Sequence, residues 1–144
     1  MVKIEEIVGF LQRVLLFHGL NKRQLERLAK RFVERKYPAG KAIVTQGHGG
    51  EGFFIIVSGK AEAIRERSDG TKAVVNTFGP TDFFGELALL DEGIRTASVV
   101  TKEDTTCLAL TSWDFLGTLK EDAEMAIVIL QELARRFRVA LDTV

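Results

Sequence analysis

The sequence predicts a chain of the α+β class that is mainly β, with helices at both ends. Apolar residues recur at helical spacing before residue 34 and again after residue 111. Between these segments, short apolar runs alternate with turn residues at intervals of about 8 to 12 residues, a pattern typical of antiparallel sandwiches and barrels. Alternating βαβ units would need helical segments between the strands, and this pattern does not provide them.

Size and composition indicate one globular domain spanning residues 1–144. Hydrophobic residues make up 46% of the chain and charged residues 28%, so it can form a core and is not expected to be disordered. Basic and acidic residues number 20 each, which argues against binding nucleic acid or a membrane surface through bulk charge. The longest apolar run, residues 125–130, is too short to span a bilayer, and the single cysteine favours the cytoplasm.

Two helices are expected in residues 1–33. The first carries an amphipathic stripe formed by Ile4, Ile7, Val8, Leu11 and Leu15. The second begins at Asn21, whose side chain can cap the helix, and Gln24 completes a capping box. Its inward face is expected to carry Leu25, Leu28 and Phe32.

Residues 34–111 are expected to form the β part. The predicted strands cover residues 42–45, 53–57, 61–65, 72–78, 97–101 and 106–110. The segments between them contain glycine with proline, serine or aspartate, the residues that favour tight turns. One stretch, residues 83–99, interrupts this rhythm with charged residues and a short helix-forming segment.

Helices return in residues 112–144. Ser112 can cap a short turn through Phe115 and Leu116, and Trp113 in this turn is expected to join the core. A long amphipathic helix follows over residues 121–141, with an apolar stripe of Ala126, Leu130, Leu133, Phe137 and Ala140. Residues 125–130 are apolar on every face, so we expect cover on two sides, from the β part and from another helix or a second subunit. The chain ends soon after this helix, and no second functional domain is expected.

The interrupting stretch carries a glycine, a glutamate and an arginine that together could bind an anion. Gly85 lets the backbone approach a ligand, and the helical turn after it begins with N–H groups that lack internal partners. Arg95 could hold phosphate oxygens in a bidentate manner. Glu86 either pairs with Arg95 or accepts hydrogen bonds from ligand hydroxyls, which would suit a sugar phosphate. An ordinary surface turn with a Glu–Arg ion pair is the alternative that these residue types leave open.

The stretch resembles the phosphate-binding cassette of cyclic nucleotide-binding domains. The similarity lies in FGELALL at residues 84–90, in RTASV at residues 95–99, and in the nine-residue step from Glu86 to Arg95. Further segments similar to the family follow in the expected order at residues 37–40, 46–47, 53–59 and 124–136. The resemblance therefore covers nearly the whole chain.

This resemblance implies an antiparallel β-roll of the jelly-roll barrel type, flanked by N-terminal helices and a C-terminal lid helix. Its cassette, residues 84–97, would bind cyclic AMP or cyclic GMP unaltered, with Glu86 on the ribose 2′-hydroxyl and Arg95 on the cyclic phosphate. The implied ligand-binding residues are Phe84, Gly85, Glu86, Leu87, Ala88, Arg95, Thr96 and Ala97, of which Gly85, Leu87, Ala88 and Ala97 would contribute backbone N–H groups. A hydroxyl at Thr96 can favour guanine, yet bacterial cyclic AMP receptors resemble this sequence too. Cyclic AMP is the expected ligand and cyclic GMP the alternative.

The C-terminal helix resembles the lid that packs over the base in these domains and moves on binding. By position, Arg136 would contact the base, and Phe137 and Ala140 would provide apolar cover. The alternative is a solvated arginine on a helix that forms a homodimer. Ile94 departs from the family pattern, in which proline often precedes the arginine.

Other chemistry finds little support. His18 and His48 are the only histidines and lie in separate turns, so they cannot supply the ligand set of a metal-dependent jelly-roll enzyme. Cys107 is expected to be a small buried residue, and Asp91 with Glu92 a solvated tip. The sequence contains no triad arrangement, phosphate-binding loop or dinucleotide fingerprint.

The sequence therefore favours a non-catalytic, cytoplasmic sensor that needs no metal or cofactor. Cyclic nucleotide binding would pass through the C-terminal helix to an attached or docked effector. The second interpretation is a β-roll that binds no nucleotide and serves as a dimerisation or interaction module, and the presence of both Glu86 and Arg95 argues against it. Because a helix-turn-helix is missing, this chain alone is not expected to bind DNA specifically.

Overall fold

The computed structural model describes residues 2–49, 52–91 and 93–142. By their contacts the residues divide into two compact parts. The helical part comprises Met1–Arg31 and Trp113–Val144, and the β part comprises Phe32–Ser112.

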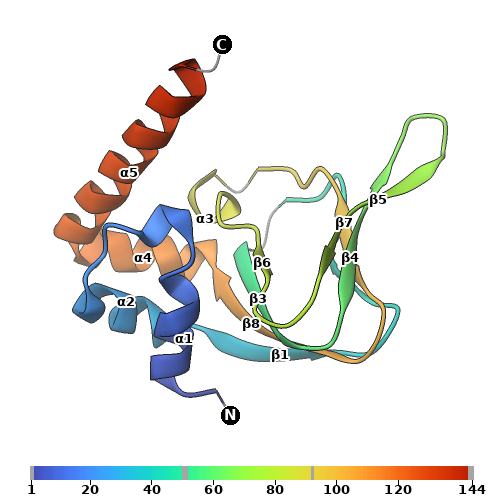
Figure 1. Ribbon diagram of the computed structural model, residues 1–144, viewed down its shortest axis with the longest axis horizontal. Coiled ribbons are helices and arrows are strands. Elements are labelled where there is room, and N and C mark those ends of the chain that lie inside the picture. The colour runs from blue at the N-terminus through green and yellow to red at the C-terminus, as the bar shows by residue number, and fades with distance from the viewer. Residues whose placement is uncertain (1, 50–51, 92, 143–144) are drawn as a thin grey trace. The chain divides into compact units, whose positions relative to one another are not determined.

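The β part is built from two four-stranded antiparallel sheets (Figure 1). One has the order β1-β8-β3-β6 and consists of β1 (Val33–Tyr37), β8 (Thr105–Thr111), β3 (Gly52–Ser58) and β6 (Phe83–Phe84). The other has the order β2-β7-β4-β5 and consists of β2 (Ala42–Val44), β7 (Ser98–Thr101), β4 (Ala61–Glu66) and β5 (Lys72–Phe78). This architecture confirms the predicted α+β, mainly β fold with an antiparallel β-roll.

Apolar side chains from both sheets form the core of the β part. Its buried members are Ile43, Val44, Phe54, Ile56, Ala61, Ala63, Phe78, Phe84, Val99, Cys107 and Ala109. Phe54 and Ile56 both belong to it because side chains two apart on a strand point to the same face. The ring of Phe84 stacks on Phe54 with the centroids 5.2 Å apart and also packs on Phe78 at 5.1 Å. These contacts fix β6, whose second residue, Phe84, begins the cassette.

All six predicted strands are present, each within one residue of the predicted bounds. The sequence does not predict β1 or β6. β1 carries three charged residues in a row, Glu34, Arg35 and Lys36, and forms because five consecutive residues pair with β8. β6 has only two residues, which pair with Phe54 and Ile55 of β3. Both strands depend on their partners rather than on an apolar run of their own.

The helical part begins with α1 (Ile4–Leu11), a 3₁₀ turn η1 (Leu15–Phe17) and α2 (Lys22–Ala29). Two expectations for this region are wrong. The first helix ends at Leu11, and Leu15 lies exposed in the separate turn, which buries Leu16 and Phe17 instead. α2 ends at Ala29, so Phe32 lies beyond it in the β part, where its ring packs edge to face on Phe53 at 6.0 Å.

The predicted capping box of α2 is confirmed. Asn21 Oδ1 accepts a hydrogen bond from the Gln24 N–H at 2.9 Å, and Gln24 Oε1 accepts one from the Asn21 N–H at 2.9 Å. We expect Asn21→Ala to lower the free energy of unfolding by about 1 kcal/mol, because a helix N–H loses its acceptor. Urea denaturation measures this loss, and Asn21→Ser, which keeps a capping oxygen, should lose less. Equal losses in the two variants would contradict the capping role.

α4 (Ser112–Glu121) and α5 (Ala123–Asp142) follow the β part. α4 is a helix of 10 residues rather than the expected short turn. Trp113 is 84% exposed on it, so the prediction that Trp113 joins the core is wrong. Phe115 is fully buried and packs on Phe17 with the ring centroids 6.0 Å apart. Among the helices that the structure describes, none is both long and apolar enough to cross a lipid bilayer.

α5 buries a different face from the predicted one. Its buried residues are Met125, Ile129 and Glu132, whereas Leu130 is 63% and Phe137 66% exposed. The predicted stripe has the right period but lies one position away from the side that the single chain covers. An apolar face of α5 is therefore open to solvent.

Candidate functional site

The cassette runs from the end of β6 into α3 (Ala88–Asp91) through a tight turn at Gly85. Gly85 has a φ of 88°, which residues with a side chain rarely adopt. The Ala88 N–H donates to the Gly85 oxygen at 3.1 Å, and the Leu89 N–H donates to the Glu86 oxygen at 3.3 Å. The helical turn thus starts at the glycine, which confirms the prediction.

Neighbouring atoms also leave no room for a side chain at Gly85, in addition to the backbone conformation that favours glycine. A Cβ atom at this position would lie 2.5 Å from the Gly52 oxygen and 2.7 Å from Arg95 Nη1. Arg95 Nη2 donates to the same Gly52 oxygen at 2.6 Å. The guanidinium of Arg95 therefore occupies room that any other residue at position 85 would take.

Arg95 is held by its backbone as well as by its side chain. Its N–H donates to the His48 oxygen at 2.9 Å, and its carbonyl oxygen accepts from the Gly47 N–H at 2.9 Å. The Nε atom of the guanidinium is shielded from solvent. An arginine that is already held in place loses less conformational freedom when it binds an anion.

A cavity of about 350 Å³ opens beside this arginine. Its lining consists of Gly85, Glu86, Leu87, Ala88, Asp91, Gly93, Ile94, Arg95 and Thr96. The volume is at the lower end of the range of small-molecule sites. Six of the eight predicted ligand-binding residues therefore lie around one cavity, and Glu86 and Arg95 are both among them.

The other two predicted residues, Phe84 and Ala97, belong to the core instead of the cavity lining. Phe84 is 9% exposed and its ring stacks on Phe54, while Ala97 is partly buried against the same cluster. Phe84 belongs to β6, whereas Ala97 directly precedes β7. Their side chains therefore support the cassette from the core, and the binding of a ligand through the Ala97 N–H stays a prediction.

Three residues that line the cavity are not predicted from the sequence to belong to the site: Asp91, Gly93 and Ile94. Asp91, expected in a solvated tip, accepts a hydrogen bond from the Gly93 N–H through Oδ1 at 2.9 Å and so closes a local turn. The Asp-x-Gly pattern of residues 91–93 could have indicated this turn. Glu92 lies outside the described residues. Leu87 and Ile94 are exposed and add apolar surface to the cavity.

Glu86 makes no ion pair within the described part of the chain, which answers the question of whether it pairs with Arg95. Glu86 lines the cavity and is half-buried. The N–H groups of Glu86 and Leu87 also find no acceptor among the described residues, whereas the Ala88 N–H is used by the turn. The cavity is thus lined by the cationic Arg95, by the acidic Glu86 and by Leu87, and the Glu86 and Leu87 N–H groups have no acceptor among the described residues.

The predicted lid residues lie on the last turns of α5. Arg136 Nε is 3.2 Å from Glu132 Oε2, and Arg135 Nη2 is 3.1 Å from Glu132 Oε1. Glu132 is 7% exposed, so two arginines neutralise a buried carboxylate. Phe137 and Ala140 are exposed. Their role as a lid stays a prediction.

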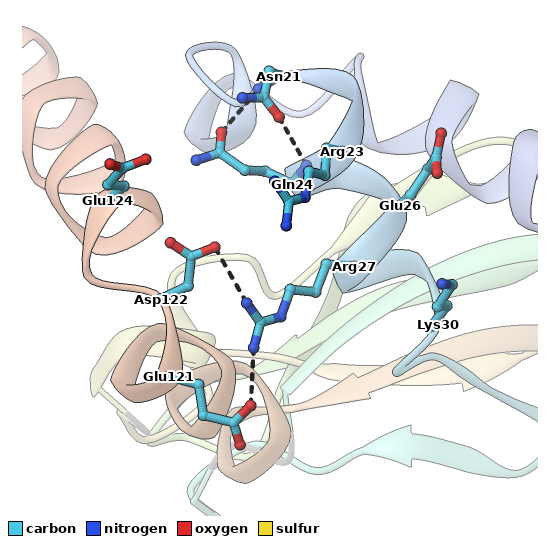
Figure 2. A pocket seen from close by; sticks show the side chains of 9 residues that line it. All are labelled: Asn21, Arg23, Gln24, Glu26, Arg27, Lys30, Glu121, Asp122 and Glu124. Atoms are coloured by element: carbon cyan, nitrogen blue, oxygen red, sulfur yellow. Dashed lines mark hydrogen bonds and ion pairs between the residues drawn. The ribbon is translucent and has the colours of Figure 1, made fainter.

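A second cavity, of about 570 Å³, lies within the helical part (Figure 2). Arg27 crosses it to reach Glu121 at 2.9 Å and Asp122 at 3.4 Å, joining α2 to the junction of α4 and α5. The remaining lining mixes both signs of charge and contains Asn21, Arg23, Gln24, Glu26, Lys30 and Glu124. Although this cavity is larger, none of the predicted ligand-binding residues lines it.

Metal and thiol chemistry receive no support from the described residues. Within ranges 2–49, 52–91 and 93–142, no three or more His, Cys, Asp or Glu side chains gather as a metal site would require. Cys107 is fully buried, as expected, and burial raises the pKa of its thiol to about 11. At neutral pH the side chain is therefore a protonated member of the core.

Comparisons with known proteins agree with this geometry. The family described as "Cyclic nucleotide-binding domain" matches residues 34–122. The cyclic AMP receptor protein of Thermus thermophilus is 39% identical over 125 residues, which are 87% of this chain and 58% of that protein. This chain thus spans less than two thirds of the length of that relative.

Two solved structures show the same fold. The N-terminal domain of a transcriptional regulator from Streptomyces coelicolor has a TM-score of 0.83 and 30% identity, covering 92% of this chain and 95% of its own. The regulatory domain of Toxoplasma gondii PKA, solved with cAMP, has a TM-score of 0.72 and 30% identity, covering 79% of this chain and 43% of its own. The family match over residues 34–122 includes the whole cassette, residues 84–97. The chain belongs to the cyclic nucleotide-binding domain family.

Proposed function

We propose that the chain is a regulatory module that binds cyclic AMP in the cassette cavity without altering it. The observation that carries this proposal is the convergence of Arg95, Glu86 and the Gly85 turn on one cavity. The relatives described above, a cyclic AMP receptor and a kinase regulatory domain solved with cAMP, support this ligand.

Each group around the cavity would have a distinct task. The cyclic phosphate carries one negative charge, and the Arg95 guanidinium would pair with its oxygens through charge-assisted hydrogen bonds. The open N–H groups of Glu86 and Leu87 would add donors to the same anion. The Glu86 carboxylate can only accept, so it would take a hydroxyl of the ribose. These groups would bind the ligand and leave it unaltered.

The choice of base would involve Thr96, which lines the cavity. Its hydroxyl could accept a hydrogen bond from the exocyclic amine of guanine, so cyclic GMP is the alternative ligand. Thr96→Ala should therefore change the ratio of the affinities for cyclic GMP and cyclic AMP more than it changes either affinity alone. Equal losses for both nucleotides would remove Thr96 from base selection.

Binding would be read out through α5 and an effector attached to or docked on the chain. A ligand can shift such an equilibrium only by the difference in its affinity for the two states. Arg136, Phe137 and Ala140 are the proposed lid residues, and the cytoplasm is the proposed location. If Arg136 contacts the base, it would have to leave the carboxylate of Glu132, which would then keep Arg135 as its partner.

Titration calorimetry with cyclic AMP and cyclic GMP tests the proposed function. We expect saturable binding with one site per chain, and a rise in melting temperature. At a ligand concentration of about 100 times Kd the fold should gain about 2.7 kcal/mol. If neither nucleotide gives heat or a thermal shift at millimolar concentration, the β-roll binds neither of them and the proposed function is wrong.

The exposed face of α5 favours a second activity, the formation of a homodimer. Ile127, Leu130, Phe137 and Leu141 are all exposed and follow one another at helical steps of three, seven and four. This spacing is that of a coiled-coil seam with Ala134 at the intervening position. Two copies could bury these side chains against each other.

Sedimentation velocity tests the dimer. We expect wild type to sediment as a dimer at micromolar concentration and Leu130→Glu to sediment as a monomer, because a charge would enter the seam. Val75→Glu on β5, where the valine is also exposed, is the matched control and should stay dimeric. A monomeric wild type would contradict the dimer, whereas a dimer that binds no nucleotide would favour the interaction-module interpretation.

A further inference from the structure

The backbone of Arg95 depends on a neighbouring loop, residues 46–49. The segment that carries Arg95 precedes β7, which begins only at Ser98. Gly47 and His48 each form one backbone hydrogen bond with Arg95, both at 2.9 Å, and Gly49 forms a bridge with Ile94. The loop thus provides a short antiparallel partner for the arginine where the regular sheet has ended.

This loop is anchored in turn by Gln46. The Gln46 Nε2 donates to the Glu66 oxygen at 2.9 Å, and Gln46 Oε1 accepts from the Glu66 N–H at 2.7 Å. Its own N–H donates to Ser98 Oγ at 2.9 Å. The side-chain amide of Gln46 therefore pairs with a backbone N–H and carbonyl as a neighbouring strand would, and it joins the loop after β2 to the last residue of β4. The backbone of Gln46 is attached to the first residue of β7.

The opposite side of the Arg95 segment is held from β4 as well. Arg65 Nε donates to the Thr96 oxygen at 3.3 Å. Residues 95 and 96 are consequently held on one side by the loop and on the other by a side chain of β4. The Gln46 amide forms two of these hydrogen bonds, both with Glu66, which is not among the residues that line the cassette cavity.

We propose that Gln46 is a positioning residue for nucleotide binding, because it fixes the loop that sets the backbone position of Arg95. The inference rests on the proposed function, since Arg95 must be the group that binds the phosphate. Without the Gln46 amide, the loop would lose its attachment to β4 and the guanidinium would sample more positions. When a group binds a ligand through oriented hydrogen bonds, a small displacement of that group weakens the binding strongly.

A double-mutant cycle tests the proposal. We expect Gln46→Ala to weaken cyclic AMP binding by about three- to tenfold, the range of one or two lost net hydrogen bonds. In the Arg95→Leu background the same change should have less than a twofold effect, because the group being positioned is gone. Equal losses in the two backgrounds would show that Gln46 does not act through Arg95. Unchanged affinity in the single variant would also overturn the proposal.

Hydrogen exchange gives a readout that does not need the nucleotide. In Gln46→Ala without ligand, the N–H groups of Gly47 and Arg95 should exchange faster, while that of Ile56 in the core strand should keep its rate. Gln46→Met, which keeps the volume and removes both hydrogen bonds, repeats the test if alanine disturbs the fold. Unchanged exchange at Gly47 and Arg95 would overturn the inference even in a protein that binds cyclic AMP.

Asp104→Ala is the matched control. Asp104 Oδ1 accepts from the Ala39 N–H at 3.0 Å, so this side chain also anchors a loop of the β part to its backbone, but it does not line the cassette cavity. It should leave both the affinity and the exchange of the Arg95 N–H unchanged. A loss of affinity equal to that of Gln46→Ala would indicate general loosening. Failure of wild type to bind either cyclic nucleotide would refute the proposed function, and the exchange experiment would still decide the role of Gln46.

Discussion

Arg95→Leu is expected to weaken cyclic AMP binding by about 1.5 to 3 kcal/mol, or roughly 10- to 150-fold. Leucine removes the cation from the cavity lining and would leave the nucleotide phosphate without its proposed charged partner. Calorimetric titration of wild type and variant under the same salt conditions measures the difference. Unchanged affinity would exclude Arg95 from the site.

Two further variants make this result specific. Arg95→Lys keeps the charge but loses the planar pair of donors, so its affinity should lie between those of wild type and Arg95→Leu. Arg67→Leu removes an exposed arginine that donates to Thr71 within the turn after β4, and it should bind as wild type does. Because Arg95 also donates to the Gly52 oxygen, the melting temperature of each variant must accompany the titration.

Phe84→Ala is expected to lower the free energy of unfolding by about 3 to 5 kcal/mol, the largest stability effect that we predict. The ring is 9% exposed and contacts both Phe54 and Phe78, so alanine would leave a cavity where β3, β5 and β6 meet. Chemical denaturation measures the loss. Any loss of affinity at low temperature, where the variant is still folded, should be smaller than that of Arg95→Leu.

Phe83→Ala is the control for the neighbouring position. Phe83 is only partly buried and packs edge to face on Phe53 with the centroids 5.6 Å apart, so its removal should cost less stability. If Phe84→Ala instead kept nearly full stability and lost affinity strongly, the ring would belong to the ligand site, as the family resemblance implies, and not to the core.

The strands and the cassette could be predicted from the sequence because their signals are local. Apolar runs between turn residues give six strands to within one residue, and the capping box at Asn21 starts α2 where expected. The step from Glu86 to Arg95 identifies the two residues that the fold brings to one cavity. Each of these signals is contained in a few consecutive residues.

The errors arise where the outcome depends on distant partners. β1 is a charged segment that forms a strand only because β8 offers five pairing positions. Trp113 is a core residue by type, yet it is exposed, and Phe115 is the aromatic residue of α4 that is buried. On α5 the sequence predicts the correct period but cannot decide which side faces a partner, since Met125, Ile129 and Leu130 are all apolar.

The residues that line the cavity also include some that the sequence predicts and others that depend on distant contacts. Resemblance assigns Phe84 and Ala97 to the ligand site because they belong to the cassette, whereas both side chains pack with the core of the β part. Asp91, Gly93 and Ile94 line the cavity because of a turn closed by the Asp91 side chain. The role of Gln46 depends on Glu66 and Ser98, which lie far from it in sequence.

A crystal structure of the protein grown with cyclic AMP tests the central claim most directly. We expect one nucleotide per chain in the cassette cavity, with a phosphate oxygen within hydrogen-bond distance of the Arg95 guanidinium and the ribose 2′-hydroxyl at the Glu86 carboxylate. A cavity that stays without nucleotide at saturating concentration, or a nucleotide bound away from Arg95 and Glu86, would contradict the account.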